Sequence, residues 1–306
     1  MKEHNLRTGI KAAAVPSLIW SLALLGGCLA WSYSSTIVEL FEFWLRNEDY
    51  SVGMLVPLVA LHLVWRKRRE LAEISISPAW SGLCLLAAAE AGRLFGVRMG
   101  LESAQRYSLV LAIAGLVLLA TGKRMFWHLR WVLLLLVLMV PLPFRVHEAV
   151  ALPLQNAATT MTVFGLETAG FYVVREGNVL RINDTTIVAV TEACSGLRML
   201  TAFVIVAAVL AFMANCATWQ RAALVILSVP IAVLSNGLRG FATAYLMCYS
   251  KSESLTENIH DIAGWAMMPL ALLLSLGALR LMKTLDAASS TGSVSKQVAN
   301  KIPIGA

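Results

Sequence analysis

The chain has 306 residues, of which 58% are hydrophobic and 14% charged, and its mean hydropathy is +0.71. Soluble domains are about 45–50% apolar and about 25% charged, so this composition excludes an ordinary soluble enzyme and indicates a membrane protein. The formal net charge of +7 is typical of a membrane protein whose basic loops stay in the cytoplasm. We therefore expect membrane lipids, and no nucleic acid, among its partners.

Apolar runs of roughly 17–25 residues are long enough to cross about 30 Å of hydrocarbon. The chain has eight candidate spans, of which the second and seventh are short: Pro16–Tyr33, Ser51–Trp65, Ala79–Gly96, Arg106–Thr121, Met125–Val140, Gly196–Met213, Arg221–Ser235 and Ile262–Met282. The first span has a basic leader, but its apolar run exceeds that of a signal peptide, so we expect a membrane helix there. These runs predict an all-α polytopic membrane protein with one integral-membrane domain over residues 1–283 and a disordered cytoplasmic tail over residues 284–306.

Basic residues are unequally divided between the two sides of this predicted bundle. With a cytoplasmic N-terminus, the inner side carries fifteen basic and four acidic residues, and the outer side carries ten basic and fourteen acidic residues. This asymmetry predicts that both termini are cytoplasmic, with the run Arg66–Arg69 as an anchor at anionic lipid. Six tryptophans are expected in interfacial belts: Trp20, Trp31, Trp44, Trp65, Trp127 and Trp131.

Charged residues also occur within a predicted span. Glu90 and Arg93 lie three residues apart in the third span, and this spacing predicts that they pair in the bundle interior.

Two long segments are expected on the outer side. In residues 141–195, an amphipathic stretch from Phe144 to Phe164 precedes a segment of short β-hairpins. The strand-like runs are Phe171–Val174, Val179–Ile182 and Thr185–Val190, with turns at Arg175–Asn178 and Asn183–Asp184. In residues 236–261, Phe241–Tyr249 gives only roughly 13 Å of helix, so we interpret it as an interfacial or re-entrant helix.

The run Thr191–Arg198 lies where the β segment meets the sixth span. A thiol at a helix N-terminus, here Cys194, feels the positive end of the helix dipole, which favours the thiolate. Arg198 falls on the same helical face, and Ser195 is suited to cap the helix. This arrangement fits a thiolate nucleophile, but a small buried cysteine beside a helix cap explains the spacing equally simply.

Two further motifs fall on the same outer face. Asn236 and Arg239 lie three residues apart at the end of the seventh span, where an arginine binds either a peptide carbonyl oxygen or a lipid phosphate. His260 lies at the outer mouth of the last span, where it acts either as a general base for a thiol or as a helix cap. His147, on the outer amphipathic stretch, is the weaker contender.

Each motif has an ordinary structural explanation when taken singly, but charge counting places all three on one surface. Their coincidence favours an active site composed of Cys194, Arg239 and His260, with Arg198, Ser195 and Asn236 in support. The five cysteines show neither a CxxC pair nor the spacing of metal ligands, so we expect no metal and no cofactor.

The runs Glu192–Arg198 (EACSGLR), Asn236–Arg239 (NGLR) and His260–Trp265 (HDIAGW) resemble the exosortase/archaeosortase family. Further similarities are Tyr50–Leu58 (YSVGMLVPL), Pro141–Pro143 (PLP) and Arg175–Asn178 (REGN), and together they cover most of residues 45–275. One departure is Val52, where many members have a histidine before the glycine. This departure bears on a role for histidine at that position and leaves the triad unaffected.

The resemblance implies a cysteine protease or transpeptidase of the cell inner membrane, with its active site facing the periplasm. Cys194 would be the nucleophile, Arg239 the stabiliser of the substrate carbonyl, and His260 the acid and base. The implied substrates are exported proteins with a C-terminal sorting signal of the PEP-CTERM type, which is a short motif, a membrane helix and a basic end.

Two other functions remain open from the sequence. A membrane acyl or lipid transferase would use the same cysteine on a lipid donor without cutting a polypeptide. A transporter or polysaccharide-export component would need no activated thiol, although the chain shows no internal repeat of the kind that transporters carry.

Overall fold

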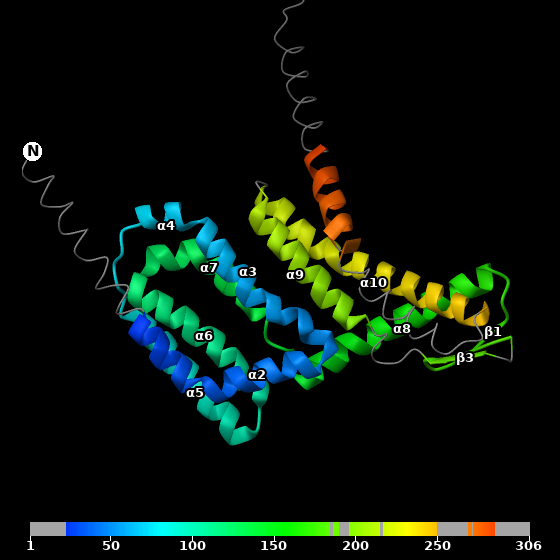
Figure 1. Cartoon of the computed structure of the whole chain (residues 1–306), viewed down its shortest axis with the longest axis horizontal. Helices are drawn as coiled ribbons and strands as arrows, with labels where there is room; N and C mark the ends of the chain where they lie inside the picture. Colours follow the sequence, from blue (N-terminus) through cyan, green and yellow to red (C-terminus); the bar gives the residue numbers. More distant parts are fainter. Residues whose placement is uncertain are drawn as a thin grey trace, which may run out of the picture. The chain divides into compact units, whose positions relative to one another are not determined.

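A computed structural model describes residues 23–183, 186–189, 196–214, 217–249, 269–270 and 272–284, except for the side chains of residues 48 and 189. Within these ranges the chain is mostly helical and has one three-stranded antiparallel sheet (Figure 1). It divides into two compact units, of which the first ends at Pro143 and the second begins at Phe144.

The described part of the first unit contains the helix Ala23–Ser32 and seven further elements. These are α2 (Ser34–Arg46), the 3-10 helix η1 (Glu48–Met54), α3 (Leu55–Arg66), α4 (Arg68–Glu73), α5 (Ser81–Met99), α6 (Glu102–Thr121) and α7 (Lys123–Val137). Helices α5 and α6 form a tight antiparallel pair because glycines lie at their interface. A Cβ atom on Gly82 would lie 2.6 Å from Leu119 Cβ, and one on Gly115 would lie 3.0 Å from Leu86 Cγ.

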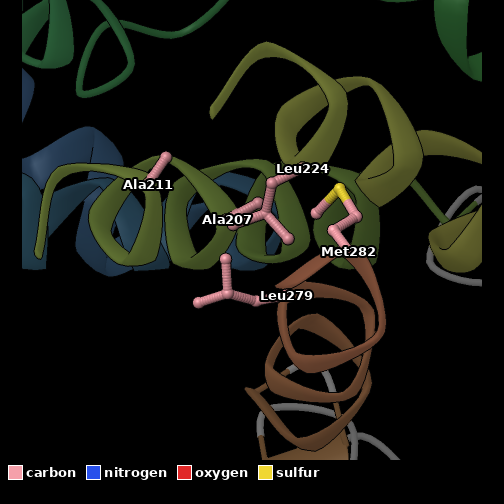
Figure 2. Close-up of a cluster of buried hydrophobic side chains, with 5 residues drawn as sticks. All are labelled: Ala207, Ala211, Leu224, Leu279 and Met282. Carbon is pink, nitrogen blue, oxygen red and sulfur yellow. The ribbon is translucent and has the colours of Figure 1, made fainter. Parts of the chain in front are cut away.

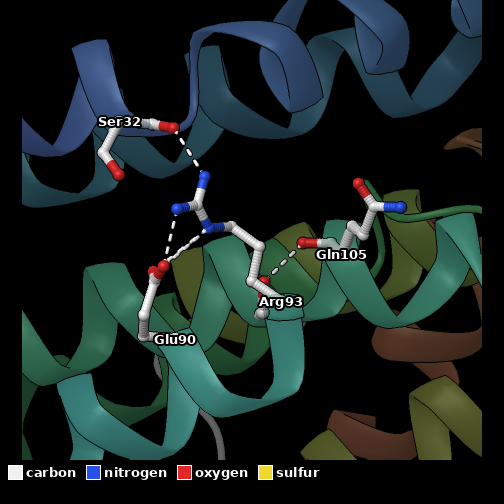
Figure 3. A network of polar contacts seen from close by, with 5 residues as sticks. Ser32, Glu90, Arg93 and Gln105 are labelled. Carbon is white, nitrogen blue, oxygen red and sulfur yellow. Dashed lines mark hydrogen bonds and ion pairs between the residues drawn. The ribbon is translucent and has the colours of Figure 1, made fainter. Parts of the chain in front are cut away.

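Arg93 connects α5 to the first helix (Figure 3). Its guanidinium forms an ion pair with Glu90, at 2.6 Å from Nη2 to Oε1, and Nη1 donates a hydrogen bond to the backbone oxygen of Ser32 at 2.8 Å. The guanidinium also lies over the ring of Tyr33. The predicted pair between Glu90 and Arg93 is therefore present, although both side chains are partly exposed.

Trp44 is a buried structural residue of the first unit. Its Nε1 donates a hydrogen bond to the backbone oxygen of Met139 at 3.0 Å, and Gly53 packs directly against the indole. The adjacent 3-10 helix η1 has Asn47 as its N-cap. Tyr50 lies in this helix, and burial raises the pKa of its hydroxyl to about 12. The prediction that Trp44 belongs to an interfacial belt is wrong, because its indole N–H satisfies a buried carbonyl.

The second unit contains α8 (Phe144–Thr168), β1 (Val173–Glu176), β2 (Val179–Ile182), β3 (Thr186–Ala189), α9 (Leu197–Met213) and α10 (Thr218–Tyr249). The three strands confirm the predicted hairpins, but β1 extends to Glu176, so the first turn contains only Gly177 and Asn178. The sheet rests on helix ends through a core of Leu166, Leu180, Ile182 and Ala244.

Helix α10 is continuous over 32 residues and changes partners along its length. Its first half runs antiparallel to α9, because Leu224 packs on Ala207 and Ala211 and the later Ala232 packs on Phe203. The helical residues 272–284 cover the same region with Leu279 and Met282 (Figure 2). The second half of α10 runs parallel to α8 and reaches the sheet.

The membrane prediction is supported in part. Among the residues that the structure describes, two helices, α6 and α10, are long and apolar enough to cross a bilayer, and two shorter apolar helices are Ala23–Ser32 and α9. The number of eight spans is therefore not confirmed. Phe241–Tyr249 is helical as predicted, but it continues the seventh span and does not form a separate helix.

We expect the substitution Trp44→Phe to lower the free energy of unfolding by about 1–3 kcal/mol, because the Met139 carbonyl loses its buried donor. Denaturation of the purified protein in detergent measures this change. Trp31→Phe is the matched control, because Trp31 is 83% exposed and its replacement should change stability by less than about 0.5 kcal/mol. Equal losses in the two variants would contradict a structural role for the Trp44 hydrogen bond.

Candidate active site

The start of α9 lies against the middle of α10. Gly196, the N-cap of α9, has a left-handed backbone with φ of +82°. A Cβ atom at this position would lie 2.7 Å from Cγ of Asn236. Glycine is therefore required both by the backbone conformation and by the absence of space. Two of the three predicted motifs, the cysteine motif and the Asn236–Arg239 motif, thus meet through Gly196.

Asn236 also holds Arg239. Arg239 Nη2 donates a hydrogen bond to Asn236 Oδ1 at 3.1 Å, and both side chains are buried, with exposed fractions of 8% for Arg239 and 3% for Asn236. Their spacing of three residues places them on one helical face, as the sequence predicted. A buried guanidinium retains its charge, because arginine is not deprotonated in proteins. The result is a fixed cation at the level where α9 begins.

Helix α8 supports this region from another side. A Cβ atom on Gly237 would lie 2.6 Å from the Met161 sulfur, and a Cβ atom on Gly240 would overlap the hydroxyl oxygen of Thr162. The two glycines flank Arg239 in sequence and let α8 and α10 approach closely. Close packing of α8 at Gly237 and Gly240 therefore fixes the backbone of the helical turn that carries Arg239.

The contribution of α8 was not predicted from the sequence. A signal was present in the spacing of Gly237 and Gly240, which lie three residues apart on one helical face and typify close helix contacts. The sequence does not indicate which helix fills the space beside them. Met161 and Thr162 lie in a stretch whose only signal is amphipathicity.

The remaining predicted site residues have different outcomes. Arg198 lies in the first turn of α9 and is half-buried, and its backbone oxygen accepts a hydrogen bond from Thr201 at 2.9 Å. Cys194, Ser195 and His260 lie outside the residues that the structure describes. The weaker contender, His147, lies in the first turn of α8 and is half-buried there.

The described part of this site has a clear electrostatic character. The N-terminal end of α9 carries partial positive charge from backbone N–H groups, and its N-cap makes no side-chain hydrogen bond. The guanidinium of Arg239 adds a full positive charge on the neighbouring helix. Such an arrangement stabilises an anion, whether a thiolate or a developing oxyanion. Across the described ranges, no group of three or more His, Cys, Asp or Glu side chains is arranged to hold a metal ion.

Comparison with protein families gives a match to a family described as transmembrane exosortase. It covers residues 44–277, which include all three motifs of the predicted site and most of both compact units. No curated protein and no solved structure matches the chain.

We expect Gly196→Ala to separate the start of α9 from Asn236 and to lower the free energy of unfolding. Gly170→Ala is the matched control, because Gly170 also has a positive φ, of +89°, but nothing lies within 4 Å of a Cβ atom there. The control should cost about 1–2 kcal/mol for the backbone alone. The Gly196 variant should cost about 1–3 kcal/mol more, because the methyl group collides with Asn236. Unfolding of both variants in detergent measures the difference, and equal costs would argue against tight packing at Gly196.

Proposed function

The chain belongs to the transmembrane exosortase family, and on this basis we propose that it is a membrane cysteine protease or transpeptidase that cleaves C-terminal sorting signals of exported proteins. Family membership supports a membrane sorting enzyme in general. The proposal goes further by assigning Cys194 as the nucleophile, Arg239 as the stabiliser of negative charge and His260 as the acid and base.

The packing of Gly196 on Asn236 is the observation that carries this assignment. Cys194 precedes Gly196 by two residues, so covalent geometry keeps their Cα atoms within about 7.6 Å. Asn236 contacts Gly196 and accepts a hydrogen bond from Arg239. Two motifs that are about 40 residues apart in sequence therefore meet at Gly196, and this contact supports the proposal that Cys194 acts close to the buried cation.

The environment suits a thiolate. The positive end of α9 and the guanidinium of Arg239 both lower the energy of a negatively charged sulfur. Arg198 in the first turn of α9 adds a further positive charge, and Ser195 is of a residue type suited to cap a helix N-terminus. In the reaction, the Cys194 thiolate attacks the scissile carbonyl and forms the S–C bond of a tetrahedral intermediate.

Arg239 is positioned to stabilise the oxygen of that intermediate. A preorganised donor in a water-poor site stabilises a developing oxyanion more strongly than water does, because it need not reorganise. Asn236 fixes one edge of the guanidinium, and close packing of α8 on Gly237 and Gly240 fixes the backbone. Asn236 therefore acts as a positioning residue.

His260 supplies the proton transfers in the proposal. When the carbon–nitrogen bond breaks, the protonated imidazole gives its proton to the leaving amine, and a Cys194 thioester remains. The neutral imidazole then takes a proton from water or an amine nucleophile as this attacks the thioester. The thiolate leaves, and the products are an acid or a new amide.

The proposed substrate is a polypeptide that ends in a short motif, a membrane helix and a basic cluster. Its helix would lie in the bilayer beside the enzyme, with the scissile bond at the outer interface. This arrangement requires the proposed topology, in which both termini are cytoplasmic and Cys194 faces the periplasm of a cell inner membrane. The charge asymmetry of the sequence supports this orientation.

We expect Cys194→Ala to reduce processing of a membrane-anchored reporter by at least about 10⁴-fold, because no thioester forms without the sulfur. Immunoblotting of cells that express a reporter with a C-terminal sorting signal measures the processed fraction. Cys248→Ala is the matched control, because Cys248 lies in α10 and its thiol donates to the backbone oxygen of Ala244. The control should process the reporter normally.

A second measurement, on the native enzyme, distinguishes a protease or transpeptidase from a lipid transferase. Mass spectrometry of the adduct trapped on Cys194 should show a peptide acyl group. A fatty acyl group would contradict the protease and identify a lipid transferase, and unchanged cleavage by the Cys194 variant would exclude this nucleophile.

We expect Arg239→Lys to lower kcat by at least about 100-fold, because a point charge cannot both hold Asn236 and bind the oxyanion in the planar geometry of a guanidinium. Kinetics in detergent with a fluorogenic substrate measure this loss. Asn236→Ala should lower kcat by less than Arg239→Lys and leave KM within about threefold, since it removes a positioning hydrogen bond and packing but keeps the guanidinium. A large rise in KM at constant kcat in either variant would instead indicate a role in substrate binding.

A further inference from the structure

A pocket of about 420 Å³ opens on the first unit, away from the predicted active-site motifs in sequence. Its walls come from the end of α4, from the segment that follows it and from the first turns of α7. The lining residues are Glu73, Ile74, Ser75, Arg124, Trp127 and His128. Arg124 Nη1 donates a hydrogen bond to Ser75 Oγ at 3.2 Å, so the two walls are joined at the pocket.

The walls are held by backbone contacts. Ser77 N donates to Thr121 O at 3.2 Å, and Ala79 N donates to Leu119 O at 3.3 Å, so the segment lies against the end of α6. Gly122, between α6 and α7, has φ of +91°, and a Cβ atom on it would lie 2.7 Å from the Ser77 carbonyl carbon. The pocket is therefore a fixed feature of the fold at this corner.

Positive charge is concentrated where α7 begins. Lys123 and Arg124 occupy its first turn, which contains no acidic residue, and the N-cap Gly122 makes no side-chain hydrogen bond. Two side-chain cations at the positive end of a helix dipole are electrostatically unfavourable. An anion bound there would be attracted by both cations and by the dipole. Glu73 is the one acidic residue of the lining and opposes such an anion.

The first unit has exposed indoles of the kind found at a membrane interface, and one of them, Trp127, lines the pocket. Trp65, Trp80 and Trp127 are between 58% and 82% exposed, as expected for indoles at the headgroup level. Arginines lie over two such rings, with Arg68 Cζ 4.3 Å from the Trp65 centroid and Arg130 Cζ 4.8 Å from the Trp127 centroid. The pocket thus combines donors for a phosphate with apolar surface for the adjoining part of a lipid.

We propose that this pocket binds the headgroup phosphate of an anionic membrane lipid. Arg124 and Ser75 donate hydrogen bonds to the phosphate oxygens, His128 lines the same wall, and Trp127 contacts the glycerol and upper acyl region. The site lies entirely within the first unit. It does not depend on the proposed peptidase activity, so either can fail without the other.

Native mass spectrometry of the full-length protein in detergent, titrated with phosphatidylglycerol, tests the site. Arg124→Gln should weaken binding of the first lipid about fivefold, since one basic residue near the phosphate is lost. Glu73→Gln should strengthen binding about two- to fivefold, because it removes the opposing charge. Arg124→Lys should retain most of the affinity, which separates loss of charge from loss of folding.

Arg98→Gln is the matched control, because Arg98 is exposed in α5, does not line the pocket and lies outside the Arg66–Arg69 anchor. It should bind phosphatidylglycerol within about twofold of the native chain. The proposal is overturned if the Arg124 and Arg98 variants lose phosphatidylglycerol binding equally, or if the native protein binds phosphatidylcholine as tightly as phosphatidylglycerol. It is also overturned if millimolar inorganic phosphate displaces the lipid, because the pocket would then be a site for free phosphate.

Discussion

The contact between Gly196 and Asn236 is the constraint on which the candidate site depends. It joins the start of α9 to the middle of α10 with no room for a methyl group, and the same asparagine holds the buried guanidinium of Arg239. One amide side chain therefore connects the segment after the cysteine motif to the cation. Asn236 and Arg239 are both buried, so a hydrogen bond lost between them is not readily replaced by one to bulk water.

Helix packing around this contact explains why an arginine is tolerated at this depth. Gly237 and Gly240 let α8 approach closely, so the turn that carries Arg239 is enclosed by protein. A charged side chain in a membrane bundle normally faces its interior or a water-filled cavity, and Arg239 follows this rule. In the first unit, Arg93 is similarly retained by pairing, with Glu90 and the backbone of Ser32 as its partners.

Local patterns in the sequence predicted the helices, the hairpins and the pairing of Glu90 with Arg93, because each depends on residues close in the chain. They also placed Asn236 and Arg239 on one face. They failed where a partner lies far away in sequence. Tryptophan is a residue type typical of membrane interfaces, but Trp44 is buried and donates a hydrogen bond to the backbone oxygen of Met139. Likewise, polar residues from Ser235 onward indicate a helix end, whereas mutual hydrogen bonding and the packing of α8 let α10 continue to Tyr249.

Because α10 is one continuous helix, the directions in which its two halves present their side chains are fixed relative to each other. Residues on its first half face α9, and residues on its second half face α8 and the sheet, with no loop between them to absorb a change in register. One residue inserted before Asn236 would turn everything beyond it by about 100°, so Arg239 and the sheet-facing Ala244 would leave their partners together. The number of residues between Leu224 and Ala244 is thus as constrained as their identity. We expect insertions to be tolerated only in segments outside this helix.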